Sequence, residues 1–357
     1  MDTIRFVFGA FLICIFAACT KEMSVQDVTE ESILRIGLAG TEQVRSVTAY
    51  SDVKDYEMQT NDLQVYVYDG DGNRIAFRSR ETGFHATHFS GIVGSMFVYS
   101  LSWQCAVNPG NVTVVGIANA PDLFASSATL SSIRSVTLDF GSTVSTDVTK
   151  GFVMYGEWTA SVRGGETVSV SLPLRRRCAR IAVGKIQNAL PSHTGQMRIE
   201  SVYLSDYVSG CQRLSDGVVP VPEYSNRQGR RDGTLTALTN HECETTVLNG
   251  ETLDLSSFPL CFYCLPNRSP NVPAGWTDEY PSDGRKTSVV FLVRIGGNSY
   301  YYPVVLNGVE AGSCYTVGLT VAGLGLNDPA DSPEMIDITS SITLSGFLPG
   351  DTFDKRL

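Results

Sequence analysis

The sequence predicts an all-β protein that consists of two β-sandwich domains in tandem. Many short segments have the period-2 alternation, or the β-branched and aromatic composition, that is typical of strands. Gly, Pro, Asn and Asp fill the gaps between these segments, which indicates frequent turns. No segment has the periodicity of an amphipathic helix of three turns, so a sandwich is expected rather than an α/β fold.

Residues 1–18 are predicted to be a signal peptide of the lipoprotein type. An apolar run over residues 6–16 follows Arg5, and two small residues precede Cys19. The run is too short to cross a hydrocarbon core, which needs about 20 apolar residues. The position of Cys19 resembles a lipobox, in which that cysteine is lipidated and becomes the new N-terminus. The alternative is an ordinary signal peptide with a chance cysteine.

Composition limits the function classes. The chain has 357 residues, a hydrophobic content of 43% and a net charge of −10, which is enough apolar material for two domains. Nucleic-acid binding requires basic patches, so no nucleic-acid partner is expected for this acidic chain. Besides Cys14 and Cys19, seven cysteines remain at irregular spacing. An odd, irregular set is a poor disulfide framework, and most of these cysteines are expected to be buried as small apolar residues.

A first strand is predicted soon after the export segment. Leu34, Ile36 and Leu38 alternate with a charged residue and a glycine, which is the pattern of a strand with one buried face. A polar loop follows over residues 40–46, where Arg45 would be available to a trypsin-like protease. The alternative for Arg45 is a solvated loop residue without such a role.

The N-terminal domain is predicted to span residues 46–173. Its clearest feature is a hairpin in which the Asp-Gly repeats at 69–73 turn one strand back into the next. The same residues begin like a calcium loop, but Arg74 and Arg80 stand where Gly and Glu are required, so a turn is expected. A short helix is expected at residues 121–125. The hairpin strands are predicted at residues 63–68 and 74–77, and further strands of this domain at residues 96–101, 111–119, 152–158 and 167–172.

The C-terminal domain is predicted to span residues 174–357. It opens with three consecutive arginines at 175–177, which suggest either a polyanion site or a solvated strand edge at a domain junction. The second interpretation is favoured because the chain is acidic. Loops are expected at 226–232 and 267–285. Strands are predicted at residues 178–186, 198–204, 260–265, 287–295, 300–306, 313–321 and 336–344.

The sequence offers no active site, so an enzyme is not expected and neither is a cofactor or metal. His85 and His88 form an H-x-x-H pair without the Glu of a zinc protease motif. Cys261 and Cys264 match C-x-x-C, but they lie in a strand-like aromatic run rather than at a helix N-terminus, where redox motifs of this kind occur. Structural packing is the favoured interpretation of this cysteine pair.

Several local sequence phrases, together with the lipobox, resemble the Bacteroidales fimbrillins, which are the subunits of type V pili. They include V-Y-V-Y-D, T-V-V-G-I-A-N-A, F-V-M-Y-G-E and Y-T-V-G-L-T-V-A-G-L-G ahead of N-D-P. No phrase is specific alone, but their order spans nearly the whole mature chain. The phrases occupy residues 65–69, 113–120, 152–157, 177–183, 262–267, 301–304, 315–325 and 327–329.

The resemblance implies two transthyretin-like domains, a lipid anchor in the outer membrane, and a place in a surface fimbria among other fimbrial subunits. It also implies assembly by donor-strand exchange. An arginine-specific protease removes the N-terminal strand, and a strand from a neighbouring subunit, commonly its C-terminal segment, fills the groove. This mode is β-augmentation, in which ladder hydrogen bonds give affinity and alternating side chains give fit.

Both ends of the sequence fit this scheme. Residues 19–45 would be the propeptide, with a plug strand and a cut between Arg45 and Ser46. Residues 336–347 would be the donor strand. The sequence departs from the family at Phe347, where Trp is expected, and the residues after Arg45 do not identify a protease site firmly. The plug positions are Leu34, Ile36 and Leu38, and the donor positions are Ile336, Ile338, Ile342 and Leu344.

The sequence therefore predicts a structural subunit of a cell-surface fimbria, exported as a lipoprotein and polymerised by strand exchange. In the competing interpretation of the two ends, both strands are ordinary strands of one monomer. The competing function is a surface lipoprotein that does not polymerise. Such a protein would be a pilus anchor, a tip adhesin, or a module that binds a host protein or glycan through loops such as 267–285.

Overall fold

Most of the predicted strands are present in the computed structural model of the chain. All structural statements concern the residues that it describes, and the predictions for residues 85–88, 96–101, 121–125, 226–232 and 268–285 lie outside them. The described residues are 32–38, 62–79, 103–120, 127–144, 151–172, 174–194, 196–215, 223–225, 240–257, 259–267, 286–329 and 338–346.

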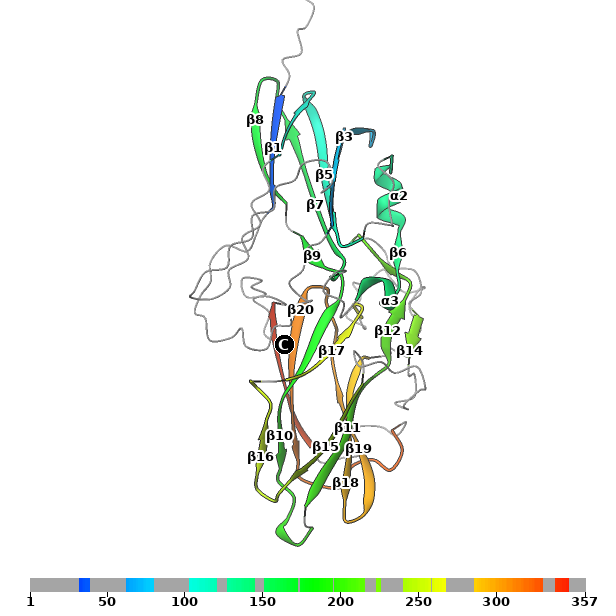
Figure 1. Cartoon of the computed structure of the whole chain (residues 1–357), viewed down its shortest axis with the longest axis vertical. Coiled ribbons are helices and arrows are strands. Elements are labelled where there is room, and N and C mark those ends of the chain that lie inside the picture. Colours follow the sequence, from blue (N-terminus) through cyan, green and yellow to red (C-terminus); the bar gives the residue numbers. More distant parts are fainter. Residues whose placement is uncertain are drawn as a thin grey trace, which may run out of the picture.

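The all-β prediction is confirmed, because the described chain folds into several β-sheets and contains only short helices. The sheets form an N-terminal and a C-terminal unit that are stacked end to end (Figure 1). Each unit has its own hydrophobic cluster between two sheets. The predicted domain boundaries themselves stay a prediction.

The N-terminal unit pairs a sheet of five strands with a sheet of three. Strand order in the larger sheet is β3 (Arg74–Ser79), β2 (Leu63–Tyr68), β5 (Gly110–Ala118), β7 (Met154–Val162) and β9 (Arg175–Arg176). Strand order in the smaller sheet is β4 (Trp103–Val107), β1 (Ser32–Leu38) and β8 (Thr167–Leu172).

Two apolar layers cover the larger sheet of the N-terminal unit, one on each face. The first lies between the two sheets and includes Leu34 and Ile36 from β1 together with Val65 and Val114 from β2 and β5. The second lies under helix α2 (Leu130–Ser135). Because β2 is buried at every position, its residues are apolar or aromatic except for Gln64, and they do not alternate with exposed ones.

The C-terminal unit pairs a sheet of five strands with a sheet of four (Figure 1). Strand β10 (Ala179–Asn188) pairs along one edge with β16 (Thr252–Asp254) and β17 (Leu260–Cys264), and along the other with β20 (Ser313–Val321). Strand β21 (Ile338–Gly346) lies at the end of this sheet, beside β20. The second sheet has the order β15 (Asn240–Val247), β11 (Met197–Ser205), β18 (Ser288–Ile295) and β19 (Asn298–Val305).

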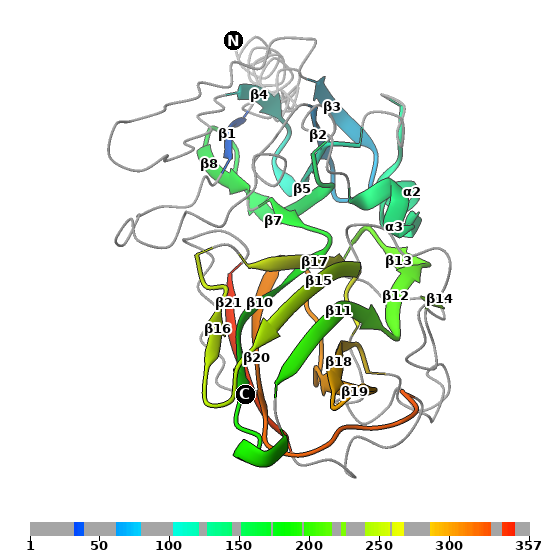
Figure 2. The same cartoon turned by 60° about the horizontal axis from the view of Figure 1, so that its bottom comes forward.

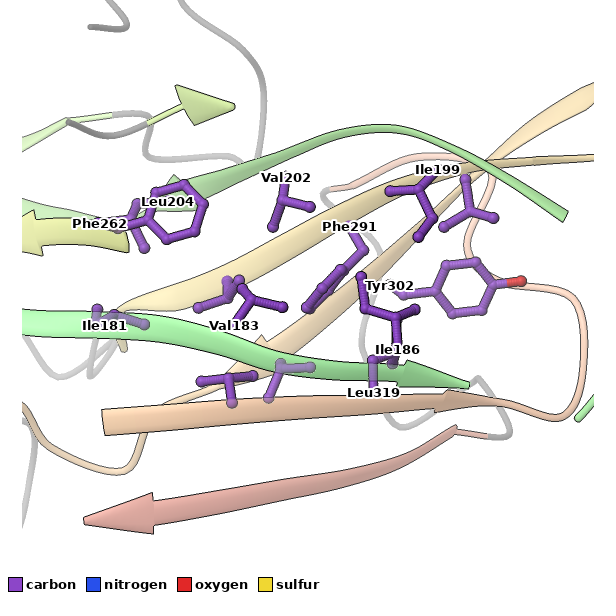
Figure 3. Packing of buried hydrophobic residues seen from close by; sticks show 14 of the residues in the cluster. Ile181, Val183, Ile186, Ile199, Val202, Leu204, Phe262, Phe291, Tyr302 and Leu319 are labelled. Atoms are coloured by element: carbon purple, nitrogen blue, oxygen red, sulfur yellow. The ribbon is translucent and has the colours of Figure 1, made fainter. Parts of the chain in front are cut away.

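Figure 3 shows how the core of the C-terminal unit is filled. Side chains from β10 and β20 meet those from β11, β18 and β19, and Phe291 and Tyr302 lie in the middle with no exposed surface. Burying a side chain of this size contributes roughly 1.5–3 kcal/mol. The alternating residues that predicted these strands therefore supply the core of the unit.

The two units meet through a fourth, smaller apolar cluster. Phe152 from the N-terminal unit contacts Tyr263 of β17, with ring centroids 5.0 Å apart in an edge-on arrangement. A short ladder also joins β6 (Thr137–Leu138) to β13 (Gln212–Arg213). Figure 2 shows this junction between the two sets of strands. Helix α3 (Phe140–Thr143) and the pair β12 (Tyr207–Gly210) and β14 (Glu223–Ser225) lie beside it.

The arginine run at the junction is a correction to the sequence analysis, which favoured solvated side chains. Arg175 and Arg176 do form an edge strand, but Arg176 and Arg177 are buried. The Arg177 guanidinium donates hydrogen bonds to the backbone carbonyls of Arg213 and Ser215. A buried cation is tolerated where such acceptors replace water, and here it ties the end of β9 to the segment at Arg213–Ser215.

Some elements have no counterpart in the sequence prediction. Strands β4 and β15 were not predicted. Among the described residues, α2 and α3 are the only α-helices. The predicted C-terminal strand is present over Ile338–Gly346, and its first two predicted residues, 336 and 337, lie outside the described residues. The hairpin at 69–73 is confirmed as a turn, because the Asp69 carboxylate accepts hydrogen bonds from the backbone N–H groups of Asp71 and Asn73.

Candidate functional site

The N-terminal strand β1 is the central strand of its sheet although it comes first in the described chain. It pairs antiparallel with β4 along residues 32–36 and parallel with β8 along residues 33–38. Both of its edges are therefore used. The covalent connection from β1 to the rest of the unit runs through the segment between β1 and β2, which contains Arg45.

The inward face of β1 is a main part of the N-terminal core. Leu34 is 0% exposed and Ile36 is 1% exposed, and both lie in the cluster between the two sheets. Leu38 aligns with Leu172 of β8. The two buried side chains each contribute roughly 1.5–3 kcal/mol, so the predicted plug strand is strongly held without any covalent bond to its neighbours.

The outward face of β1 is open to solvent. Ile33 is 40% exposed and Arg35 is also exposed. This alternation is the one that the sequence predicted for residues 34–38. The outward residues therefore contribute little to the binding of β1 in its sheet, whereas the inward row of side chains determines that binding.

Ser32 begins the inward row and is a residue of the candidate site that the sequence analysis did not identify. Its side chain is 0% exposed, and its hydroxyl donates a hydrogen bond of 2.6 Å to the backbone carbonyl of Arg163. The next residue, Ile33, donates its backbone N–H to the carbonyl of Glu166 at 2.9 Å. The turn between β7 and β8 thus fixes the start of β1. The only sequence signal is that Ser32 stands two residues before Leu34.

The surface of β4 and β8 that β1 covers is here named the β1 groove. Its inward residues opposite β1 are Trp103 and Cys105 on β4, and Val168 and Val170 on β8. Cys105 is the direct partner of Leu34. Partial burial raises the pKa of the Cys105 thiol to about 11, which keeps the thiol protonated near neutral pH.

Cys105 should therefore report whether β1 is in place. If β1 leaves, desolvation is lost and the pKa falls toward the ordinary value of 9.0, so the thiolate fraction at pH 8 should rise up to about a hundredfold. Maleimide labelling followed by peptide mass analysis measures this change. Cys264 is the internal control, because complete burial raises its pKa to about 12 in the other unit. Equal labelling of Cys105 before and after removal of β1 would contradict this assignment.

Strand β21, which contains most of the predicted donor strand, is held differently from β1. It pairs antiparallel with β20 over residues 338–346, and β20 is its one partner in the sheet among the described residues. Ile342 is partly buried and packs against the C-terminal core, whereas Ser340 and Ser341 are exposed. Ile338 and Leu344 lie within β21, while Ile336 lies outside the described residues.

The remaining sequence predictions concern the lipidation site, the cleavage site and the C-x-x-C pair. Cys19, Arg45 and Ser46 lie outside the described residues. Cys261 and Cys264 are both buried on β17 and unbridged, which agrees with structural packing. Across the part of the chain that the structure describes, no cluster of three potential metal ligands is found. No helix of that part is both long and apolar enough to span a membrane.

A second candidate is an open hollow of about 490 Å³ on the C-terminal sheet. It is lined by polar side chains, among them Lys185, Gln187 and Asp254. Lys185 and Asp254 are 3.4 Å apart and more than half exposed, so this ion pair is weak and its two charges already face each other. The hollow therefore offers less specific chemistry than the β1 groove.

Comparison with known proteins points to one family. Residues 34–170 match the family model of the major fimbrial subunit protein (FimA). This stretch begins in β1 and ends in β8, so it covers the β1 groove and its occupant. The predicted resemblance to the Bacteroidales fimbrillins is thereby confirmed. No curated protein sequence matches the chain.

Solved structures share the fold over most of the chain. A fimbrilin (fimA) from Porphyromonas gingivalis has a TM-score of 0.58 at 12% identity, covering 90% of this chain and 98% of that one. A protein provisionally assigned to cell adhesion from Bacteroides eggerthii has a TM-score of 0.55 at 17% identity, covering 88% and 95%. A similar protein from Parabacteroides distasonis has a TM-score of 0.55 at 13% identity, covering 90% and 98%. At these identities the likeness establishes the fold.

Proposed function

We propose that this chain, whose residues 34–170 match the FimA family and whose fold is that of a solved fimbrilin, is a structural subunit of a cell-surface fimbria. The subunit assembles by strand exchange. Strand β1 is the plug that is removed, and the C-terminal strand of another copy takes its place. The observation that carries this proposal is the central position of β1 in its sheet.

A cut at Arg45 would turn a stable strand into a replaceable one. Arg45 lies between β1 and β2 in the sequence, so cleavage there leaves only non-covalent contacts between β1 and the rest of the unit. While the chain is intact, the covalent connection keeps β1 at a high effective concentration beside its groove. After the cut, a released β1 is diluted and a competing strand can enter.

The ladder geometry favours the exchange. Strand β21 leaves an edge at which it has the single partner β20, whereas in the β1 groove it would pair with both β4 and β8. On exchange, β21 would lose one ladder of backbone hydrogen bonds and gain two. Ile342, which is only partly buried at its present position, would become fully buried between two sheets. Because β21 belongs to the C-terminal unit, the incoming strand is supplied by a neighbouring copy.

The export part of the proposal rests on residues 1–45. Lipidation at Cys19 would anchor the precursor in the outer membrane, and removal of residues up to Arg45 would release the subunit from that anchor. The same cut would then free the polymerising subunit and open the β1 groove. This arrangement couples release from the membrane to assembly, so that subunits do not polymerise before they reach the cell surface.

The N-terminus of the surface form tests this function. Subunits sheared from the cell surface should begin at Ser46, because β1 must be absent from an assembled subunit. An Arg45→Gln variant should keep Cys19 as its N-terminus and remain cell-bound and monomeric. A matched Arg35→Gln change, on the exposed face of β1, should leave processing normal. Fimbriae built from subunits that still begin at Cys19 would refute the proposed removal of β1.

A further inference from the structure

We propose that the incoming strand enters the β1 groove in one register, with Ser340, Ile342 and Leu344 of a second copy at the positions of Ser32, Leu34 and Ile36. This inference rests on the proposed strand exchange and specifies its geometry. It assigns a positioning role to Ser340 and the backbone carbonyl of Arg163, which together would fix where the strand stops.

The groove imposes a pattern of three inward positions on its occupant. The position of Ser32 is a fully buried hydroxyl site, whose acceptor is the Arg163 carbonyl at 2.6 Å. The positions of Leu34 and Ile36 follow at spacings of two residues and are fully buried apolar sites. These three places are here named the hydroxyl site, the first apolar site and the second apolar site. An apolar side chain at the hydroxyl site would lose this hydrogen bond to the exposed turn residue Arg163.

The C-terminal segment repeats this pattern in the direction in which β1 runs. Ser340-Ser341-Ile342-Thr343-Leu344 places a hydroxyl, an isoleucine and a leucine on one row, as Ser32-Ile33-Leu34-Arg35-Ile36 does. The other row is polar in the C-terminal segment and exposed in β1. The match covers the first five residues of the seven-residue β1, because Gly346 falls at the position of Leu38.

Other registers in this direction conflict with the groove. A shift by one residue would turn the row of Ser and Thr side chains inward. If the strand is shifted so that earlier residues enter the groove, a shift of two or four residues puts Ser340 into an apolar site. A shift of six residues in the same sense puts Glu334 at the buried hydroxyl site. A shift of two in the opposite sense puts Gly346 at the second apolar site and leaves a cavity there. Among these registers, only the proposed one satisfies all three sites.

The present position of Ser340 does not account for the serine that interrupts the apolar row. In β21 it lies opposite Leu319, which is buried, and two residues before Ile342, which packs on the same core. Ser340 is nevertheless exposed, and within the described part of the chain no hydrogen bond of its side chain is found. The serine therefore gives its own unit neither a packed side chain nor a side-chain hydrogen bond. In the β1 groove it would have the Arg163 carbonyl as its acceptor.

Cys105 gives a direct test of the register. It is the partner of Leu34 in the precursor, so in the proposed register it lies opposite position 342 of the incoming strand. Opposite residues of antiparallel strands have Cα atoms about 4.5–5.5 Å apart, which a disulfide can bridge. Full-length Ile342→Cys protein, cut between residues 45 and 46 at an engineered protease site and then oxidised, should give a ladder of cross-linked oligomers on a non-reducing gel.

The matched variants are Ser340→Cys and Leu344→Cys, which would lie opposite Val107 and Trp103. They should polymerise without cross-linking to Cys105, and a Cys105→Ala change should abolish the ladder of Ile342→Cys. Oligomers in which Ser340→Cys or Leu344→Cys is linked to Cys105 would overturn the register while leaving strand exchange intact. Absence of oligomers from every protein, wild type included, would overturn the proposed function itself.

A second pair of variants tests the hydroxyl without a new thiol. Ser340→Ala should speed dissociation of assembled oligomers about fivefold, because one hydrogen bond, worth about 1 kcal/mol, would be lost at the Arg163 carbonyl. Ser341→Ala changes the neighbouring residue, whose side chain would face solvent in the assembled state, and should leave dissociation unchanged. Equal effects of the two substitutions would contradict the positioning role of Ser340.

Discussion

A chain that ends at residue 335 should stay monomeric after the cut at Arg45, whereas the full-length chain should polymerise. The truncation removes β21 and the residues after it, and with them the inward row that would fill the β1 groove. Loss of polymer should be complete, since strand insertion is the sole link between neighbouring subunits in this account. Analytical ultracentrifugation of the cut proteins measures the difference.

The truncation needs a companion variant, because it also uncovers the edge of β20. An Ile342→Asp, Leu344→Asp chain keeps its full length but would place two charges in apolar sites of the groove, and it should also fail to polymerise. A Ser341→Asp chain carries a charge on the other row and should polymerise normally. Circular dichroism confirms that each chain is folded. Long polymers from the truncated protein would show that subunits are joined elsewhere.

Weakening the inward face of β1 should remove the need for a protease. Leu34→Ala and Ile36→Ala each delete a fully buried side chain, and such changes cost about 2–5 kcal/mol apiece. Together they approach the whole stability of a typical domain, about 5–15 kcal/mol. We expect the uncut double variant to release β1, to expose Cys105 to maleimide and to form oligomers, which size-exclusion chromatography detects.

The control for the double variant lies on the same strand. Ile33 is 40% exposed, so Ile33→Ala removes a side chain of the same size from the outward face and should leave the precursor monomeric. The loss in free energy of unfolding caused by each alanine is measured best in separate single variants, because the effects of substitutions at neighbouring sites in one cluster need not be additive. An uncut double variant that stays monomeric with an unreactive Cys105 would mean that β1 is not the element that prevents assembly.

The strands of this protein were largely predictable because their patterns are local. Leu34, Ile36 and Leu38 alternate strictly, and the Asp-Gly turn at 69–73 marks a hairpin whatever the rest of the chain does. The predicted C-terminal strand is also found, over the described residues Ile338–Gly346. Periodicity thus located both strands of the proposed exchange.

The pairing of the strands was not predictable, because it depends on residues far apart in the sequence. Nothing near Leu34 indicates that its neighbours are Cys105 and Val168, or that one of these pairings is parallel. Ser32 also escaped notice, since its role arises from a carbonyl that lies 131 residues away in the chain. The same reason explains the buried Arg177, whose acceptors are carbonyls 36 and 38 residues away in the chain.

The central claim is that β1 blocks assembly and that its removal permits it. The most direct measurement is electron microscopy of purified full-length protein before and after complete cleavage at an engineered site between residues 45 and 46. We predict monomers before the cut and filaments after it, with the peptide that contains β1 absent from the filaments. Fully cleaved protein that has lost this peptide and yet remains monomeric would contradict the claim.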